Sequence, residues 1–142
     1  MRGLARWPFL GTLIAVAAAF AACAGVGPYA TPAWPVVPIS DIKSVAGRWE
    51  GLIQREPGGE RDDFIQVTIK DDGTYQAAAY RVIGALERTG KLSLQSGKLT
   101  ASTDTGSATY TLYAGGGRRI LRVEGGTRDS SLKFYGNLRP SK

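Results

Sequence analysis

The feature that most constrains the fold is a series of short segments in which apolar and polar residues alternate. In 64–70, Ile65, Val67 and Ile69 are apolar and the intervening residues are polar, which is the pattern of a half-buried β-strand. Gly, Asp and Ser recur between such segments, as in 71–73, 95–97 and 104–106, and these residues favour tight turns. The pattern predicts eight strands: 48–54, 64–70, 74–82, 84–94, 98–103, 107–114, 118–124 and 130–139.

Regular spacing and tight turns predict an all-β domain over 41–142, either an antiparallel barrel or a sandwich. Sequential hairpins favour a small eight-stranded up-and-down barrel, whose interior holds side chains or one small ligand. Alternation places Tyr75, Ala77, Ala79 and Tyr110 on inward faces. These four residues are candidate ligand-lining positions, although small side chains also let a narrow barrel close. A short helical turn over 39–46, capped by Ser40 or Asp41, is expected to precede the first strand.

The composition excludes several chemistries. The 142 residues include no His and one Cys, so a catalytic unit that needs His, a zinc site of the usual Cys/His type and an internal disulfide are all ruled out. The acidic pairs 62–63 and 71–72 coincide with predicted turns, which explains them without acid–base chemistry or calcium binding. We therefore predict that the protein is not an enzyme and has no catalytic residues, metal or cofactor.

The N-terminal segment has the pattern of a secretory signal. Two arginines lie within 1–6, the stretch 7–26 is uncharged, and small residues precede Cys23. Phe20-Ala21-Ala22-Cys23 resembles the lipobox of bacterial lipoproteins, which implies cleavage of a signal peptide at 1–22 and attachment of acyl chains to Cys23. An ordinary signal peptide with a stray cysteine and an uncleaved membrane helix over 7–26 remain alternatives.

The lipoprotein resemblance also implies a location. The protein would be anchored in the cell envelope through lipid on Cys23; because Ala24 is not Asp, a Gram-negative host would hold it in the outer membrane, facing the periplasm. Residues 23–40 would form a Pro-rich tether, since prolines at intervals of three or four residues favour extended chain reaching roughly 45 Å. This compartment argues against nucleic acid as a partner despite the basic composition.

The start of the domain carries a second resemblance. The residues 44–49, Ser-Val-Ala-Gly-Arg-Trp, resemble the opening of lipocalin and calycin barrels, where a short helical turn precedes Gly-x-Trp on the first strand. The resemblance implies that Trp49 closes one end of the barrel and that an arginine near the end of the last strand packs across it. Arg139 is the first candidate for this arginine and Arg122 the second. The alternative is that Trp49 is an ordinary core residue.

Two function classes remain open. In the first, the barrel binds a small apolar or amphiphilic ligand; in the second, a solid barrel is a structural module that docks on an envelope protein complex. A candidate anion patch, for phosphate or lipid headgroups, gathers around one predicted hairpin, although a solvated hairpin has the same composition. Its residues are Arg118, Arg119, Arg122 and Arg128.

Overall fold

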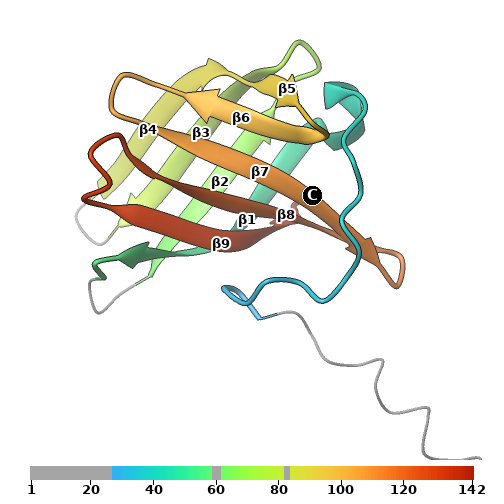
Figure 1. Ribbon diagram of the computed structural model, residues 1–142, viewed down its shortest axis with the longest axis horizontal. Helices are drawn as coiled ribbons and strands as arrows, with labels where there is room; N and C mark the ends of the chain where they lie inside the picture. Colours follow the sequence, from blue (N-terminus) through green and yellow to red (C-terminus); the bar gives the residue numbers. More distant parts are fainter. Residues whose placement is uncertain (1–26, 59–61, 82–83) are drawn as a thin grey trace, which may run out of the picture.

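The computed structural model describes residues 27–58, 62–81 and 84–142 (Figure 1). This part of the chain forms one 3-10 turn and nine strands and contains no α-helix. The elements are η2 (Ile42–Val45), β1 (Gly47–Glu56), β2 (Asp63–Ile69), β3 (Thr74–Arg81), β4 (Gly84–Lys91), β5 (Ser93–Gln95), β6 (Lys98–Ser102), β7 (Gly106–Gly115), β8 (Arg118–Thr127) and β9 (Lys133–Pro140).

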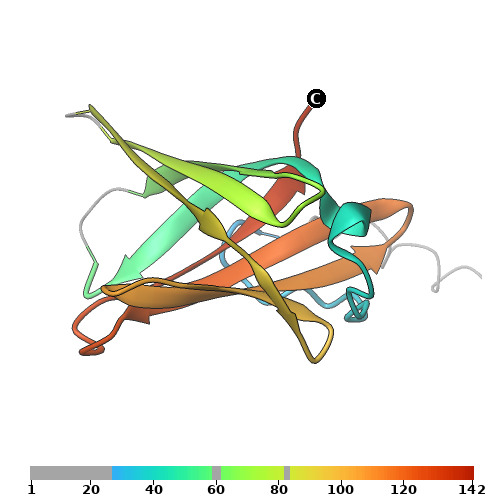
Figure 2. The same ribbon diagram turned by 90° about the horizontal axis from the view of Figure 1, so that it is seen from above.

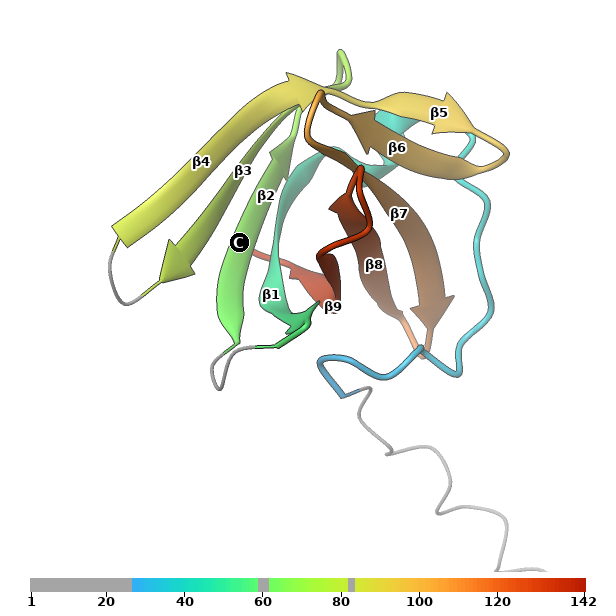
Figure 3. The same cartoon turned by 60° about the vertical axis from the view of Figure 1, so that its left-hand side comes forward.

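All nine strands belong to one antiparallel sheet with the order β4-β3-β2-β1-β9-β8-β7-β6-β5. The sheet curls into a nearly closed up-and-down barrel, which confirms the predicted fold class (Figure 3). The β1–β9 pairing brings the first and last strands together, a contact that is distant in sequence. Seen from above, β2–β4 lie on one side of the barrel and β6–β8 on the other (Figure 2).

The strand count differs from the prediction because segment 84–94 divides into β4 and β5. β4 pairs with β3, whereas β5 pairs with β6 at the other end of the sheet. Leu92 lies between them, with its side chain 3% exposed and its N–H donating to the Gly73 carbonyl at 2.8 Å. The chain therefore bends at a buried leucine and passes from one end of the curled sheet to the other.

Alternation decides which side chains enter the core. Ile65, Val67 and Ile69 are buried as predicted, and the expected helical turn is present as η2, with Asp41 as its cap. The core residues fill the barrel interior and include Val45, Trp49, Ile53, Ile65, Val67, Ile69, Tyr75, Leu92, Leu99, Ala101, Tyr110, Leu112, Leu121, Val123 and Leu138.

Residues 27–40, here called the N-terminal strap, lie along the outer wall of the barrel, so this part of the predicted Pro-rich tether packs against the domain (Figure 1). Prolines lack N–H groups, but their carbonyls still accept hydrogen bonds from the wall. Four backbone bonds spread the contact over the barrel: Asn137 N–H to the Pro28 carbonyl at 2.8 Å, Ala114 N–H to the Pro35 carbonyl at 3.3 Å, Val37 N–H to the Leu112 carbonyl at 2.9 Å and Ile39 N–H to the Gly97 carbonyl at 2.9 Å.

The predictions for the signal peptide at 1–22, the lipidated Cys23 and the alternative membrane helix at 7–26 lie outside the described residues. Within the described part of the chain, no helix is both long enough and apolar enough to cross a membrane.

Candidate binding pocket inside the barrel

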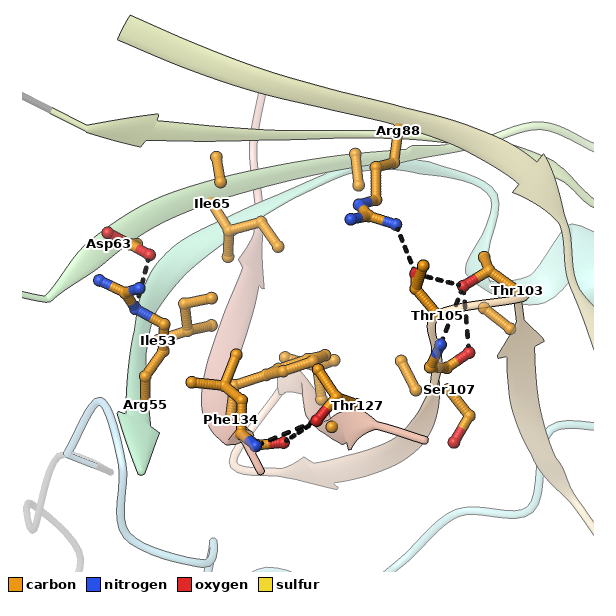
Figure 4. Close-up of a pocket in the computed structure, with 18 of the residues that line it drawn as sticks. Ile53, Arg55, Asp63, Ile65, Arg88, Thr103, Thr105, Ser107, Thr127 and Phe134 are labelled. Atoms are coloured by element: carbon orange, nitrogen blue, oxygen red, sulfur yellow. Dashed lines mark hydrogen bonds and ion pairs between the residues drawn. The ribbon is translucent and has the colours of Figure 1, made fainter. Parts of the chain in front are cut away.

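A pocket of about 250 Å³ lies inside the barrel (Figure 4). It runs from the buried Tyr75 and Tyr110 to the strand ends farthest from Trp49, where Thr105 and Ser107 are exposed to solvent. We call this the open end. The volume is slightly below the roughly 300 Å³ at which typical small-molecule pockets begin, so the space suits a small ligand.

The pocket wall is mainly apolar and draws on strands from all round the barrel. Tyr75, Ala77, Ala79 and Tyr110, the four predicted lining residues, all lie on it. Burial raises the pKa of Tyr110 well above its usual range, so its hydroxyl stays neutral. Other wall residues were not among the predicted lining positions, although their alternation with polar neighbours marks the same inward face: Ile53, Ile65, Ala101, Ala108, Val123 and Phe134.

Polar side chains surround the open end of the pocket (Figure 4). Arg55 Nε lies 3.1 Å from an Asp63 carboxylate oxygen, and the side chains of these residues are 27% and 6% exposed. Arg88 on β4 donates to the Thr105 hydroxyl at 3.2 Å, which links β4 to the turn between β6 and β7. The pocket therefore combines an apolar interior with a rim that offers guanidinium and hydroxyl donors.

Trp49 lies at the opposite end, here called the closed end. Its indole is 1% exposed, and its Nε1 donates to the Val45 carbonyl of η2 at 2.8 Å. The Arg119 guanidinium lies over the ring, 5.4 Å from its centroid, and donates to the Ser44 carbonyl at 2.8 Å. A cation over an indole stabilises by about 0.5–2 kcal/mol. The tryptophan and a neighbouring arginine thus cover this end together.

The arginine over Trp49 is not the predicted one. Arg139 is exposed on β9, because Leu138 beside it points into the core and strand side chains alternate. Arg122 also faces outward, 5.7 Å from the centroid of the Tyr135 ring. Arg119 lies two and four residues before the core residues Leu121 and Val123, so it belongs to the inward face of β8. This alternation in the sequence would have identified Arg119 as the arginine beside Trp49.

Arg122 and Asn137 bind the N-terminal strap to the outer wall. Arg122 is 6% exposed, donates to Glu124 at 3.0 Å and to the Tyr29 carbonyl at 2.9 Å, and also contacts the Asn137 side-chain oxygen at 3.2 Å. Burial, together with the nearby Asp62 carboxylate, raises the pKa of Tyr29 to about 12. Arg122 is therefore a structural residue of the strap contact.

The four predicted patch arginines do not gather in one place. Arg118 and Arg119 lie at the closed end and Arg128 lies in the β8–β9 turn at the open end, so Arg118 and Arg128 are separated by about 33 Å of extended strand. The length of β8 was not foreseen, and it carries Arg128 to the far end. A surface hollow of about 320 Å³ at the closed end instead brings together Trp34, Arg118, Arg119 and Arg139.

One member of each acidic pair has a local structural role. Asp72 accepts bonds from the Thr74 backbone and hydroxyl, which lower the pKa of its carboxyl below the usual value. Asp63 pairs with Arg55, and Asp62 is exposed. Among the described residues, no three His, Cys, Asp or Glu side chains lie close enough to hold a metal ion.

The fold and the pocket define the class of protein: a small, nearly closed, up-and-down β-barrel with an interior pocket, compatible with a lipocalin-like fold. No protein-family model, curated protein or solved structure matches the chain.

Proposed function

We propose that this protein is a bacterial envelope lipoprotein whose barrel binds a small apolar or amphiphilic ligand. The observation that carries the proposal is the interior pocket, with its apolar wall and polar rim. Each CH₂ group that moves from water onto such a wall contributes about 0.8 kcal/mol. An amphiphile would place its apolar part near Tyr75 and Tyr110 and its polar part near Arg88 and Thr105.

A pocket-filling variant tests ligand binding. Ala77 lines the pocket, whereas Gln76, its neighbour on β3, is exposed on the outer face. The full-length chain is purified from cell envelopes, and native mass spectrometry measures any co-purified small molecule. Wild type and the control Gln76→Leu are expected to carry it, and Ala77→Leu to lose at least about 90% of it, since one misplaced methyl group already costs about 1–3 kcal/mol. An empty wild type, or equal occupancy in all three proteins, would count against ligand binding.

The membrane location is tested separately. The support for it is the match of residues 20–23 to a lipobox, with the single cysteine of the chain at the position of lipid attachment. Intact-mass measurement of the mature protein should give the mass of a chain that begins at Cys23 plus acyl groups. Cys23→Ser should move the protein out of the membrane fraction. Wild-type protein with an unmodified cysteine would exclude lipid attachment.

A second candidate function is docking on an envelope protein. Leu52, Phe64 and Tyr80 stand opposite one another on β1, β2 and β3 and are 37%, 38% and 47% exposed. The Phe64 and Tyr80 ring centroids are 6.1 Å apart. This apolar row suits a protein partner, because exposed aromatic side chains contribute strongly to interfaces. A photo-crosslinking residue at position 64 should then capture one protein in stoichiometric amount, and recovery of uncrosslinked monomer would argue against docking.

A further inference from the structure

The charges of the described residues are divided between the two ends of the barrel. The closed end has nine basic side chains and four acidic ones: Lys43, Arg48, Lys70, Lys91, Lys98, Arg118, Arg119, Arg139 and Lys142, with Asp41, Glu50, Asp71 and Asp72. The open end has five basic residues and six acidic ones: Arg55, Arg81, Arg88, Arg128 and Lys133, with Glu56, Asp62, Asp63, Glu87, Asp104 and Asp129. The closed end is therefore strongly basic, whereas the pocket end is close to neutral.

The basic end also carries an aromatic side chain at its surface. Trp34 of the strap lies under the Arg118 guanidinium, with 5.6 Å between the guanidinium carbon and the ring centroid. Arg119 and Arg139 complete the wall of the 320 Å³ hollow beside it. Tryptophan with clustered arginine is a combination that favours the headgroup layer of a membrane, where the ring and the cations both find partners.

The strap brings the predicted anchor to the outer wall of the barrel, since Gly27 contacts Asn137 in the second half of β9 and Tyr29 lies beside Asp62. The Gly27 carbonyl accepts from the Asn137 side chain at 2.7 Å, and Asn137 is two residues before Arg139 on β9. Three residues lie between Cys23 and Gly27, so the four Cα–Cα steps that join them span at most about 14 Å. Lipid on Cys23 would therefore hold the barrel close to the bilayer, with the basic end within reach of its surface.

We propose that the closed end docks on an anionic lipid surface and that the pocket opens away from the membrane. Anionic headgroups attract the basic end far more strongly than the nearly neutral open end, so the difference in charge sets the orientation. The inference rests on the membrane location in the proposed function and is independent of the ligand. It implies that any ligand enters from the aqueous side.

Lysine labelling in vesicles tests this orientation. The full-length chain is reconstituted into vesicles of phosphatidylglycerol or of phosphatidylcholine, and a membrane-impermeant amine reagent is added. Mass spectrometry then gives the labelling rates of Lys98 at the closed end and Lys133 at the open end. Lys98 should react at least about fivefold more slowly on phosphatidylglycerol than on phosphatidylcholine, because each basic residue near an anionic surface contributes about that factor. Lys133 should react equally on both, and salt at about 1 M should remove the difference.

Matched double variants identify the residues responsible. Arg118→Gln with Arg139→Gln should lose most of the Lys98 protection, whereas Arg128→Gln with Lys133→Gln should keep it. Urea unfolding checks that both variants are folded, and the salt dependence of the wild type tests the proposal without any variant. Equal labelling rates of Lys98 on the two lipids, or slower labelling of Lys133 instead of Lys98, would overturn the proposed orientation. Absence of the wild-type chain from the vesicle fraction would overturn the membrane location beneath it.

Discussion

Truncation of Asn137 to Ala tests the strap contact directly. Asn137 is 5% exposed, and its side-chain nitrogen donates to the carbonyls of Gly27 and Ala30, each at 2.7 Å. Its side-chain oxygen accepts from Arg122 at 3.2 Å. The truncation removes these three hydrogen bonds and leaves the backbone bond from Asn137 N–H to the Pro28 carbonyl as the nearest strap contact.

The expected loss of unfolding free energy is about 2–3 kcal/mol, because a hydrogen bond contributes about 1 kcal/mol net and three are removed. Arg122 keeps its bonds to Glu124 and to the Tyr29 carbonyl, so its buried charge remains partnered and adds little to the loss. Release of the strap at Gly27 to Ala30 into water would limit the loss to the lower end of this range.

Urea unfolding of the full-length chain measures this change, and amide hydrogen exchange locates it. The backbone N–H at position 137 should exchange faster in the variant than in the wild type, whereas the N–H groups of Val37 and Ile39 should stay protected in both. Gln54→Ala is the control, since Gln54 is exposed and its side chain accepts a bond from Tyr135 at the surface. A loss no larger than that of the control, about 0.5 kcal/mol, would refute the view that the strap is an integral part of the wall.

Three further outcomes follow from single contacts. Arg119→Met removes the cation over the buried indole and should lower the unfolding free energy, measured with urea, by about 0.5–2 kcal/mol. Arg139→Met should lower it less, and equal effects would contradict the assignment of Arg119 as the arginine over Trp49. Asp129 accepts hydrogen bonds from turn hydroxyls, which hold the pKa of its carboxyl at about 2. Its stabilising effect is therefore present above the ordinary carboxyl pKa of 3.8 and is lost as the pH falls through about 2. Carboxyl titration by NMR measures this pKa, and a midpoint near 4 would contradict the prediction. In Gly115→Ala the new Cβ would lie 2.7 Å from the Trp34 ring. The unfolding free energy should therefore fall by about 1–3 kcal/mol and the Trp fluorescence should shift. An unchanged stability and an unchanged spectrum would argue against this packing.

Most of the barrel could be predicted from local pattern. The period of two placed Ile65, Val67 and Ile69 on one face, and the turn residues marked where strands end, because both signals depend on residues near one another in sequence. The same alternation pointed Tyr75 and Tyr110 inward, and both reach the pocket. The split of 84–94 was missed because it depends on Leu92 packing into the curled sheet, a contact with distant strands.

The N-terminal strap shows where local pattern was insufficient. The spacing of Pro28, Pro32 and Pro35 predicts extended chain, whereas the strap bends at 28–30 and 33–34. The spacing also carries no information about what the chain touches. The contact depends on Asn137 and Arg122, which lie about a hundred residues later on the outer wall. Such partners become visible only when the strands that carry them are side by side.

The sequence alone therefore determined most of the strands and their inward faces, since both depend on neighbouring residues, and the lipid anchor at Cys23 stays a prediction. The tertiary structure decided that Arg119 covers Trp49, that the strap belongs to the wall, and that an apolar pocket lies between the strands. It also decided that basic side chains gather at the end away from that pocket. These features join residues that are far apart in the chain, and only the closing of the sheet brings them together.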